Sequence, residues 1–449
     1  MISVAQVEEA LQTLFGEETN QLAKDTDFVK REREVTGAKF ALTLVFGWLA
    51  KAESSVEELV QMARASGLLI SESGLSQRFT QAAADFLREL LDRASRLCLK
   101  ADPVEVAMLR PFPAVIVEDS TTITLPQALV EVWEGCGGRG NASSAAVKVH
   151  VRFDLLTGAI MGLQLTDASV SDSASPFRSQ GDETATAPAG CLYLADLGYF
   201  ALGWIKAFCK RGESGKKRAV LMRLKQGTVL QTRSKHRLQV HALLPQQVGK
   251  VLEMGVLLGV EACLPVRLLM VRLPEEVVQQ RRERLQEEAK DHGREVSAEQ
   301  WFLAQWTILL TTVPRRVLGI GEVCVLLRLR WQIELLFKLW KEHGQIDDWR
   351  SKSPWRILCE FYGKLIAMLL QQWLLEYGIW DDPYRSLVKA AQVVRKHALS
   401  LLYALRGRYA MVTVLTDLRA MMQGCHVTVR KDRPCAAQLL SSGIDWTLT

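Results

Sequence analysis

The chain has 449 residues, of which 48% are hydrophobic and 24% are charged, and its formal net charge is +6. This length is enough for several domains around at least one large core, and the composition excludes a disordered or fibrous protein. The mildly basic balance permits a nucleic-acid partner without requiring one.

The cysteines and the apolar segments indicate the cellular location of the protein. The nine cysteines are scattered without a CxxC pair, which argues against a zinc ribbon, and an odd number does not suit a disulfide framework. The N-terminal stretch has acids where a signal peptide needs bases, and the most apolar late run is interrupted by Gln371, Gln372 and Glu376. We therefore expect reduced thiols, no membrane segment and a cytoplasmic location.

Residues 1–100 are expected to be helical. Apolar residues recur at three- and four-residue spacing over 54–65 and 75–94. Two helices joined by a short turn are compatible with a helix-turn-helix, in which Arg78 would point from the second helix to DNA. They are equally compatible with an ordinary helical hairpin, which the pattern alone favours.

Strands are expected after residue 101. One apolar run ends at Asp119 and another, followed by a helix, ends at Asp196. Between them, residues of about 146–155 and 159–166 alternate as the two strands of a hairpin. A further strand follows the helix, in the segment KRAVLMRLKQG.

Residues 226–318 are predicted to be an insertion that is mainly β. Short strand-like pieces surround a highly charged helix over 275–291, which we expect to be a solvated surface. The segment WFLAQWTILLTTVP then returns to a buried strand. A helix is expected over 319–345, and the chain should remain largely helical to about 405.

The helix expected over 319–345 has two faces at 100° per residue. Its apolar stripe, predicted to pack against a core, contains Ile333, Leu336, Leu339 and Trp340. Its polar stripe contains Arg330, Glu334, Lys338 and Lys341. Taken alone, this polar stripe is ordinarily a solvated face with ion pairs between residues four apart.

The two strand-end aspartates change the interpretation of Glu334. The order of strand with Asp, hairpin, strand with Asp, helix, strand and late helix with Glu is typical of an RNase H-like fold. In such a fold a mixed sheet flanked by helices brings three carboxylates together. Two Mg²⁺ ions held roughly 3.5–4 Å apart stabilise the entering and leaving oxygens when water or a 3′-hydroxyl attacks a phosphodiester. Mg²⁺ prefers hard oxygen ligands, so no histidine is needed.

These motifs resemble those of the DDE transposases of bacterial insertion sequences, most closely the insertion-sequence-four branch, which has a β-rich insertion before its last acid. The branch has a Tyr-x2-Arg-x3-Glu-x6-Lys signature, which Arg330, Glu334 and Lys341 match. Leu327 stands at the tyrosine position and cannot donate that residue's hydrogen bond to phosphate.

Two upstream motifs carry the rest of the resemblance, which covers roughly 105–375. The family's Asp-Ser/Thr context is matched at 119–121, and its Asp-x-Gly-[Phe/Tyr]-Phe motif is matched at 196–200. The signature is specific because its separated pieces occur in the right order.

The resemblance implies a site and its ligands. Asp119, Asp196 and Glu334 would be catalytic and bind two Mg²⁺ ions, with Mn²⁺ able to substitute. Arg330 and Lys341 would contact DNA phosphate near the scissile bond, because cations beside a metal-binding Glu suit a polyanion.

Further DNA contacts are weaker predictions. We assign Lys338 to the same face as Lys341. Lys148 and Arg152 share one face of the hairpin, which is either a DNA-facing edge or, as the pattern favours, a solvated face. Related enzymes hold a flipped base with an aromatic residue of the insertion, a role for Trp306 or Trp301 that competes with the favoured core role.

The resemblance implies a DNA transposase that binds terminal inverted repeats and catalyses Mg²⁺-dependent strand cleavage and strand transfer to target DNA. It would act as a homodimer on double-stranded DNA, in the bacterial cytoplasm and associated with the nucleoid. Two alternatives remain: an RNase H-like nuclease that only hydrolyses, and a catalytically weak DNA-binding derivative that acts as a repressor.

The predicted fold class is α/β, an RNase H-like mixed sheet flanked by helices, with a mainly β insertion and helical termini. Residues 1–100 form a helical DNA-binding region, and 101–225 form the first part of the catalytic domain. The insertion spans 226–318, the last catalytic helix region 319–375, and a mostly helical region for dimerisation 376–449.

Overall fold

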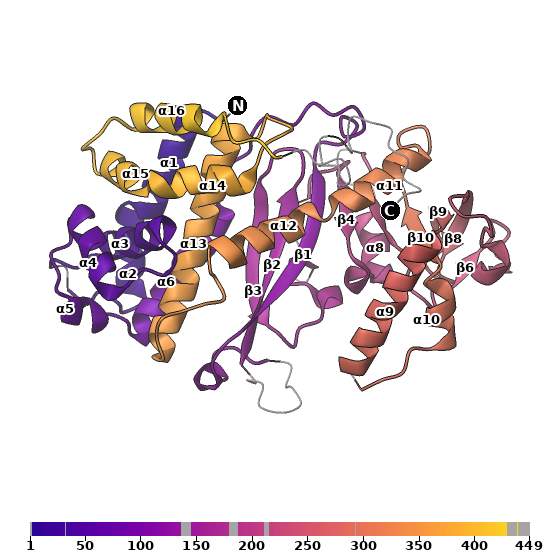
Figure 1. Ribbon diagram of the computed structural model, residues 1–449, viewed down its shortest axis with the longest axis horizontal. Coiled ribbons are helices and arrows are strands. Elements are labelled where there is room, and N and C mark those ends of the chain that lie inside the picture. The colour runs from indigo at the N-terminus through magenta and orange to yellow at the C-terminus, as the bar shows by residue number, and fades with distance from the viewer. Residues whose placement is uncertain are drawn as a thin grey trace. The chain divides into compact units, whose positions relative to one another are not determined.

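The computed structural model describes residues 2–31, 33–135, 145–178, 187–210, 215–291, 293–428 and 438. The chain divides into two compact units (Figure 1). The first comprises Met1–Val104, Asp119–Ser171 and Trp331–Cys435. The second comprises Glu105–Glu118, Asp172–Arg330 and Ala436–Thr449.

Helices form the N-terminal part of the first unit, as predicted. They are α1 (Val4–Phe15), α2 (Glu17–Asp25), α3 (Gly37–Ala50), α4 (Val56–Ala65), α5 (Glu72–Ser76) and α6 (Gln81–Arg96). The single helix expected over 75–94 is wrong in one respect. α5 ends at Ser76, and Thr80 accepts a hydrogen bond from the Ala83 amide and starts α6 as its N-cap.

The C-terminal helices belong to the same unit. They are α13 (Pro354–Ile379), α14 (Leu387–Lys396), α15 (Ala398–Leu405) and α16 (Met411–Met422). α13 is buried from Ile357 to Ile379 and packs against α3, α6, α14 and α16 (Figure 1). Gly363 permits the close approach to α3, since a Cβ there would lie 2.3 Å from the Trp48 ring. The late apolar run is thus a core helix, and no described helix is long and apolar enough to cross a membrane.

A buried carboxyl group in α13 makes the stability of this unit depend on pH. Glu376 is 3% exposed. Burial raises the pKa of Glu376 well above its ordinary range; Asp154 adds to the increase and Gln372 opposes it. Because the folded chain holds this proton more tightly than the unfolded chain does, the stabilisation is complete below the unfolded pKa and is lost as pH rises through the folded pKa.

We predict that Glu376→Gln flattens this dependence, because the amide keeps the shape and cannot ionise. Above the folded pKa the variant should exceed wild type in unfolding free energy by about 1–3 kcal/mol, because wild type then buries a charged carboxylate and the variant a neutral amide. Denaturant unfolding from pH 5 to pH 9 measures this, with the exposed Glu342→Gln as control. Parallel curves for wild type and Glu376→Gln would contradict the prediction.

The hairpin is formed by β2 (Ala146–Asp154) and β3 (Ile160–Asp167) in the first unit, as predicted. Gly158 turns the chain with φ +79°, and a Cβ there would clash with the Trp380 ring. The Trp380 Nε1 donates to the Leu156 carbonyl at 3.0 Å, which fixes the turn against the end of α13.

The second unit is built on a mixed sheet that starts from β1 (Val115–Thr124), whose chain continues into the first unit. β1 pairs parallel with β4, β4 pairs parallel with β5, and β5 pairs antiparallel with β10. The order then continues β9, β8, β6 and β7 in antiparallel pairs. These strands are β4 (Leu192–Ala195), β5 (Ala219–Arg223), β6 (Leu230–Gln231), β7 (Arg237–Leu238), β8 (Val251–Leu258), β9 (Leu264–Arg272) and β10 (Trp306–Thr311).

Helices and short turns complete the second unit. They are α8 (Leu202–Phe208), α9 (Glu275–Asp291), α10 (Ala298–Leu303) and α11 (Ile320–Leu329), with short 3₁₀ turns at Asp172–Ala174, Pro176–Arg178, Leu197–Tyr199 and Val240–Leu243. α9 is the charged helix expected over 275–291. The segment expected to be one buried strand instead begins as α10 and becomes β10 only at Trp306.

The strand order supports the predicted fold class. β3, β2 and β1 are neighbours in that order, and β1 is followed by β4 and β5. A mixed sheet with helical termini, extended beyond β10 by the antiparallel strands β9, β8, β6 and β7, is the α/β, RNase H-like arrangement that the sequence predicts.

Candidate active site

Asp119 lies within β1, directly after its four buried residues, and Asp196 directly follows β4, the parallel neighbour of β1. The expectation that the first strand ends at Asp119 is wrong, because β1 continues to Thr124. The register pairs Glu118 of β1 with Ala195 of β4, so each aspartate is the next residue after one member of this pair. Both are half-buried, whereas the residues before them in the two strands are buried. This local pattern explains why an apolar run ends in an acid at both places.

The two aspartates differ in their local hydrogen bonds. The Ser120 amide donates to Asp119 Oδ1 at 2.9 Å. Asp196 precedes a 3₁₀ turn, Leu197–Tyr199, but its carboxylate makes no capping hydrogen bond there. Gly198 is needed because a Cβ would lie 2.9 Å from Asp172 Oδ2. Gly198 of the Asp-x-Gly motif thus allows the turn after Asp196 to pack closely against Asp172.

Glu334 lies on α12 (Gln332–Lys338) in the first unit, and its side chain is exposed. The apolar stripe predicted for this helix is buried, with Ile333, Leu336, Leu339 and Trp340 at 2% exposure or less. Phe337, which the helical wheel places near the polar face, is also buried.

The prediction of one helix over 319–345 is wrong. α11 ends at Leu329 and α12 begins at Gln332, and the boundary between the two units falls between Arg330 and Trp331. α12 then passes into a π-helix, η6 (Leu339–His343). A π-helical turn changes the angular position of every later residue, so the wheel cannot be extended unchanged to Lys341.

The basic residues of this segment have mixed surroundings. Lys341 Nζ donates to the Thr122 carbonyl at 3.2 Å, so η6 touches β1 three residues beyond Asp119. Lys338 Nζ lies 3.5 Å from Glu342 Oε1 in an exposed ion pair. Ion pairs of this kind, between residues four apart, are what a solvated helix face ordinarily has. Arg330 is half-buried at the end of α11.

The other residues predicted to contact DNA differ in their exposure. Arg152 is 1% exposed beside a β-bulge, so it belongs neither to a solvated face nor to a DNA-facing edge. Lys148 is half-buried and donates to the Val170 carbonyl at 2.6 Å. Arg78 is exposed but lies in the turn between α5 and α6, so the expectation that it projects from a recognition helix is wrong.

The two tryptophans of the insertion are held by arginines. Trp306 is 4% exposed, its Nε1 donates to the Pro245 carbonyl at 2.8 Å, and Arg272 stacks 4.6 Å from its ring centroid. Trp301 is half-buried under Arg282, whose Cζ lies 4.9 Å from its ring centroid. Trp306 therefore has the core position that the sequence favours.

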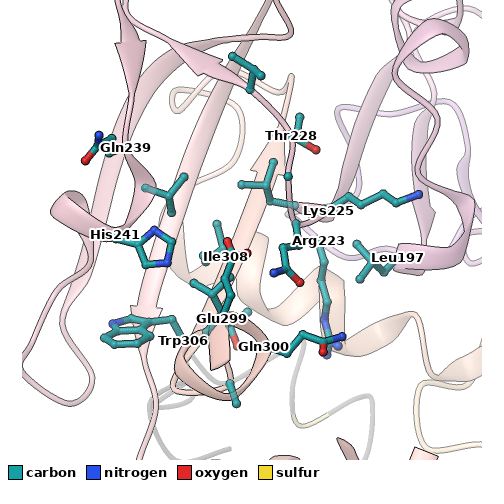
Figure 2. A pocket seen from close by; sticks show the side chains of 18 of the residues that line it. Leu197, Arg223, Lys225, Thr228, Gln239, His241, Glu299, Gln300, Trp306 and Ile308 are labelled. Atoms are coloured by element: carbon teal, nitrogen blue, oxygen red, sulfur yellow. The ribbon is translucent and has the colours of Figure 1, made fainter. Parts of the chain in front are cut away.

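The second unit contains a basic cavity (Figure 2). One of its lining residues is Leu197, which follows Asp196 in the chain. Its volume is about 730 Å³. Of the described residues that line it, one is acidic, Glu299. The basic lining residues are Arg223, Lys225, Arg237, His241 and Arg281. Figure 2 shows His241 and Trp306 on one side and Arg223 and Lys225 on the other.

The cavity keeps an excess of positive charge. Arg281 donates to the Trp306 carbonyl at 3.1 Å and to Thr307 Oγ1 at 2.8 Å, and neither partner is charged. Burial lowers the pKa of Arg281 to about 10, and the nearby charges of Arg223 and Arg284 contribute. Arg281 still carries its proton at neutral pH. Sequence reasoning missed this group, although Arg223 is the last residue of β5 and follows three buried residues.

Two of the described cysteines, Cys209 and Cys324, are unsuited to thiol chemistry. Burial raises the pKa of Cys209 and of Cys324 to about 11 each, so both are protonated at neutral pH and poor nucleophiles. The carboxylates of Asp119 and Asp196 are therefore better candidates for catalysis than these thiols.

The donor set suits a hard divalent cation. Two half-buried aspartates and an exposed glutamate offer only oxygen ligands, which Mg²⁺ prefers. Among the described residues, no three His, Cys, Asp or Glu side chains lie close enough together to hold an ion. Asp119 and Glu334 belong to the first unit and Asp196 to the second, so convergence of the three stays a prediction.

Comparisons with known proteins agree with one family. Residues 110–370 match the family model described as the transposase DDE domain. The chain is 29% identical over 372 residues to the transposase for insertion sequence element IS231C of Bacillus thuringiensis subsp. berliner, which covers 78% of this chain and 75% of that one. It is 26% identical over 445 residues to the IS231F transposase of Bacillus thuringiensis subsp. israelensis, covering 93% and 90%. The IS1151 transposase of Clostridium perfringens is 26% identical, covering 79% and 76%.

Proposed function

The chain belongs to the transposase DDE-domain family, and on that premise we propose that it binds the terminal inverted repeats of an insertion sequence, cuts at those ends and joins their 3′-hydroxyls to target DNA. The observation that carries this proposal is the register of β1 and β4, which sets Asp119 and Asp196 next to one paired position. The matched segment, 110–370, also includes Glu334.

In this proposal Asp119, Asp196 and Glu334 are the catalytic residues and hold two Mg²⁺ ions. When bound, such ions stabilise the charge that develops on the entering and leaving oxygens of the phosphodiester. Glu334 is exposed on α12, so its carboxylate is accessible both to a metal ion and to the DNA that the ion binds. The Ser120 amide orients the Asp119 carboxylate by donating a hydrogen bond to Oδ1.

DNA contacts are proposed for Arg330, Lys338 and Lys341 beside Glu334. Lys341 has donors left after its single bond to Thr122, because an ammonium group carries three. The second unit has a basic cavity of its own, which we propose as a further DNA contact. Leu327 contributes no phosphate contact, and its half-buried side chain lies near the end of α11.

We predict that Arg223→Ala weakens DNA binding and lowers the slope of log K against log salt by about 1, because one phosphate contact is lost. Titrating terminal DNA at several salt concentrations measures the slope. Lys290→Ala is the matched control, because Lys290 is exposed on α9 outside the cavity. An unchanged slope for Arg223→Ala would remove the cavity from the DNA surface.

A two-part assay tests the proposed function. Duplexes carrying the ends of the element that encodes this chain are incubated with Mg²⁺ to detect cleavage, and pre-cut ends are incubated with target DNA to detect joining. Hydrolysis without joined products would support the nuclease alternative. Binding without cutting or joining would support the repressor alternative, and either result would overturn the proposal.

The proposed setting is a homodimer on DNA in the bacterial cytoplasm, since two ends must be brought together. The helices α14–α16 are the proposed dimer surface. Exposed apolar side chains on this region support that choice, among them Val388, Leu399, Val412 and Met421.

A further inference from the structure

Lys364 is a buried cation that the proposed chemistry does not use. It lies in α13 and is 1% exposed. Its Nζ lies 2.9 Å from Glu360 Oε1, one turn earlier in the same helix and also buried. Burying two charges costs free energy even when they are paired, so a pair at this place needs a reason beyond stability.

The ammonium group also holds the turn that ends the π-helix. Lys364 Nζ donates to the Gln345 carbonyl at 3.0 Å and to the Asp348 carbonyl at 2.8 Å. Gln345 has φ +47°, a left-handed conformation that non-glycine residues rarely adopt. Such a conformation persists only where its surroundings hold it, and Lys364 supplies two of the bonds that do so.

The turn is connected in the other direction to the strand of Asp119. The Gln345 amide donates to the Lys341 carbonyl at 3.0 Å, and Lys341 Nζ donates to the Thr122 carbonyl of β1 at 3.2 Å. A chain of polar contacts therefore runs from Lys364 through η6 to a point three residues from Asp119. All of these residues belong to the first unit.

Close packing fixes the same helix end. A Cβ on Gly344 would lie 2.5 Å from Met368 Sδ and 2.5 Å from the Trp340 carbonyl. The Ile346 amide donates to the Trp340 carbonyl at 3.3 Å, which closes the π-helix. With so little free space, a change at the turn must be transmitted along η6 to α12.

We propose that Lys364 is a positioning residue, which holds the turn after η6 and thereby sets Glu334 and Lys341 relative to Asp119 for divalent-metal binding. This inference rests on the proposed function, because it takes Glu334 and Asp119 as metal ligands. Groups that hydrogen-bond a metal ligand directly are typically worth 10–100-fold in metal affinity or activity. Lys364 acts through the turn instead, so we expect an effect at the lower end of this range.

The test uses full-length Glu360→Gln/Lys364→Met, which removes the carbonyl bonds without leaving a buried charge unpaired. Single Lys364→Met and Lys364→Arg chains accompany it. Amide hydrogen exchange over 339–348, Mn²⁺ binding by calorimetry and the Mg²⁺ concentration for half-maximal cleavage are measured. We expect faster exchange in this segment and about tenfold weaker metal binding, with partial recovery in Lys364→Arg. The Kd for terminal DNA should change less than metal binding does, because Lys341 is one of several proposed phosphate contacts.

The control is Leu370→Ala, which removes a buried side chain from the same helix away from the turn. It should lower thermal stability without changing the metal requirement. Equal metal shifts in Leu370→Ala and the double variant, an unchanged metal requirement in a folded double variant, or unfolding of both Lys364→Met chains would each overturn the proposal. Failure of the proposed function is recognised separately, because wild type would then not cut DNA or Glu334→Ala would cut it normally.

Discussion

Replacing Glu334 with Ala should reduce metal-dependent cleavage of terminal DNA by more than about 100-fold, because even an outer-shell partner is worth 10–100-fold. Binding of the same DNA should change by no more than about twofold, since affinity rests mainly on basic contacts to phosphate. Cleavage rates and Kd values measured on the same preparation separate the two effects.

The physical reason is the position of Glu334 on α12. Its neighbours Ile333 and Leu336 are buried, so the backbone is fixed while the carboxylate is exposed. Removing the side chain beyond Cβ leaves this packing intact. Loss of activity with an unchanged unfolding midpoint would therefore report on the metal site rather than on folding.

Glu342→Ala is the matched control. Glu342 is an exposed glutamate two turns later and pairs only loosely with Lys338, at 3.5 Å. An exposed pair of this kind contributes about 0–1 kcal/mol, so this variant should cut DNA normally. If Glu334→Ala retained full activity, the assignment of the third carboxylate would be wrong even if the chain proved to be a transposase.

The positions of the acids could be predicted from local sequence. An apolar run that ends in an acid marks the end of the buried part of a strand. Asp119 follows the four buried residues of β1, although β1 itself continues to Thr124, and Asp196 follows β4. The hairpin could also be predicted, because its alternation and its Thr-Gly turn are short-range signals. Burial of one face of α12 follows equally from the helical repeat.

Other features depend on contacts that are distant in sequence. Nothing local marks the break at Arg330 and Trp331, because both have ordinary helical propensity. The π-helix is closed by Gln345, whose left-handed conformation is held by Lys364 of another helix. A wheel drawn from sequence cannot include such a turn.

Burial of Arg152 escaped prediction for a related reason. Alternation along β2 correctly assigns Lys148 and Arg152 to one face, because the register is regular between them. β2 is nevertheless buried on both faces from Val149 to Asp154, so Arg152 is 1% exposed while Lys148 is half-buried. The basic cavity was missed because Arg223 and Arg281 lie on separate elements, β5 and α9, and come together only in the fold.

Trp340→Ala should lower the free energy of unfolding by about 3–5 kcal/mol, the usual cost of removing a fully buried Trp side chain. Trp340 is 0% exposed in η6, and its ring lies 6.1 Å from that of Phe337 in an edge-on arrangement. Denaturant unfolding measures the loss. Trp349→Ala is the control, because Trp349 is half-buried in the following loop and should lose much less.

Trp340→Phe distinguishes packing from hydrogen bonding at this position. Trp340 Nε1 is buried without a hydrogen-bond partner in the described part of the chain, so its loss removes an unpaired donor. Phe keeps most of the apolar ring, and Trp340→Phe should therefore retain most of the stability that Trp340→Ala loses. It should also cut DNA better than Trp340→Ala does, because the buried ring holds the segment that carries Glu334. If Trp340→Phe and Trp340→Ala lowered the unfolding free energy equally, the indole would stabilise the chain through a polar contact. Packing of the ring would then not explain the stability of this segment.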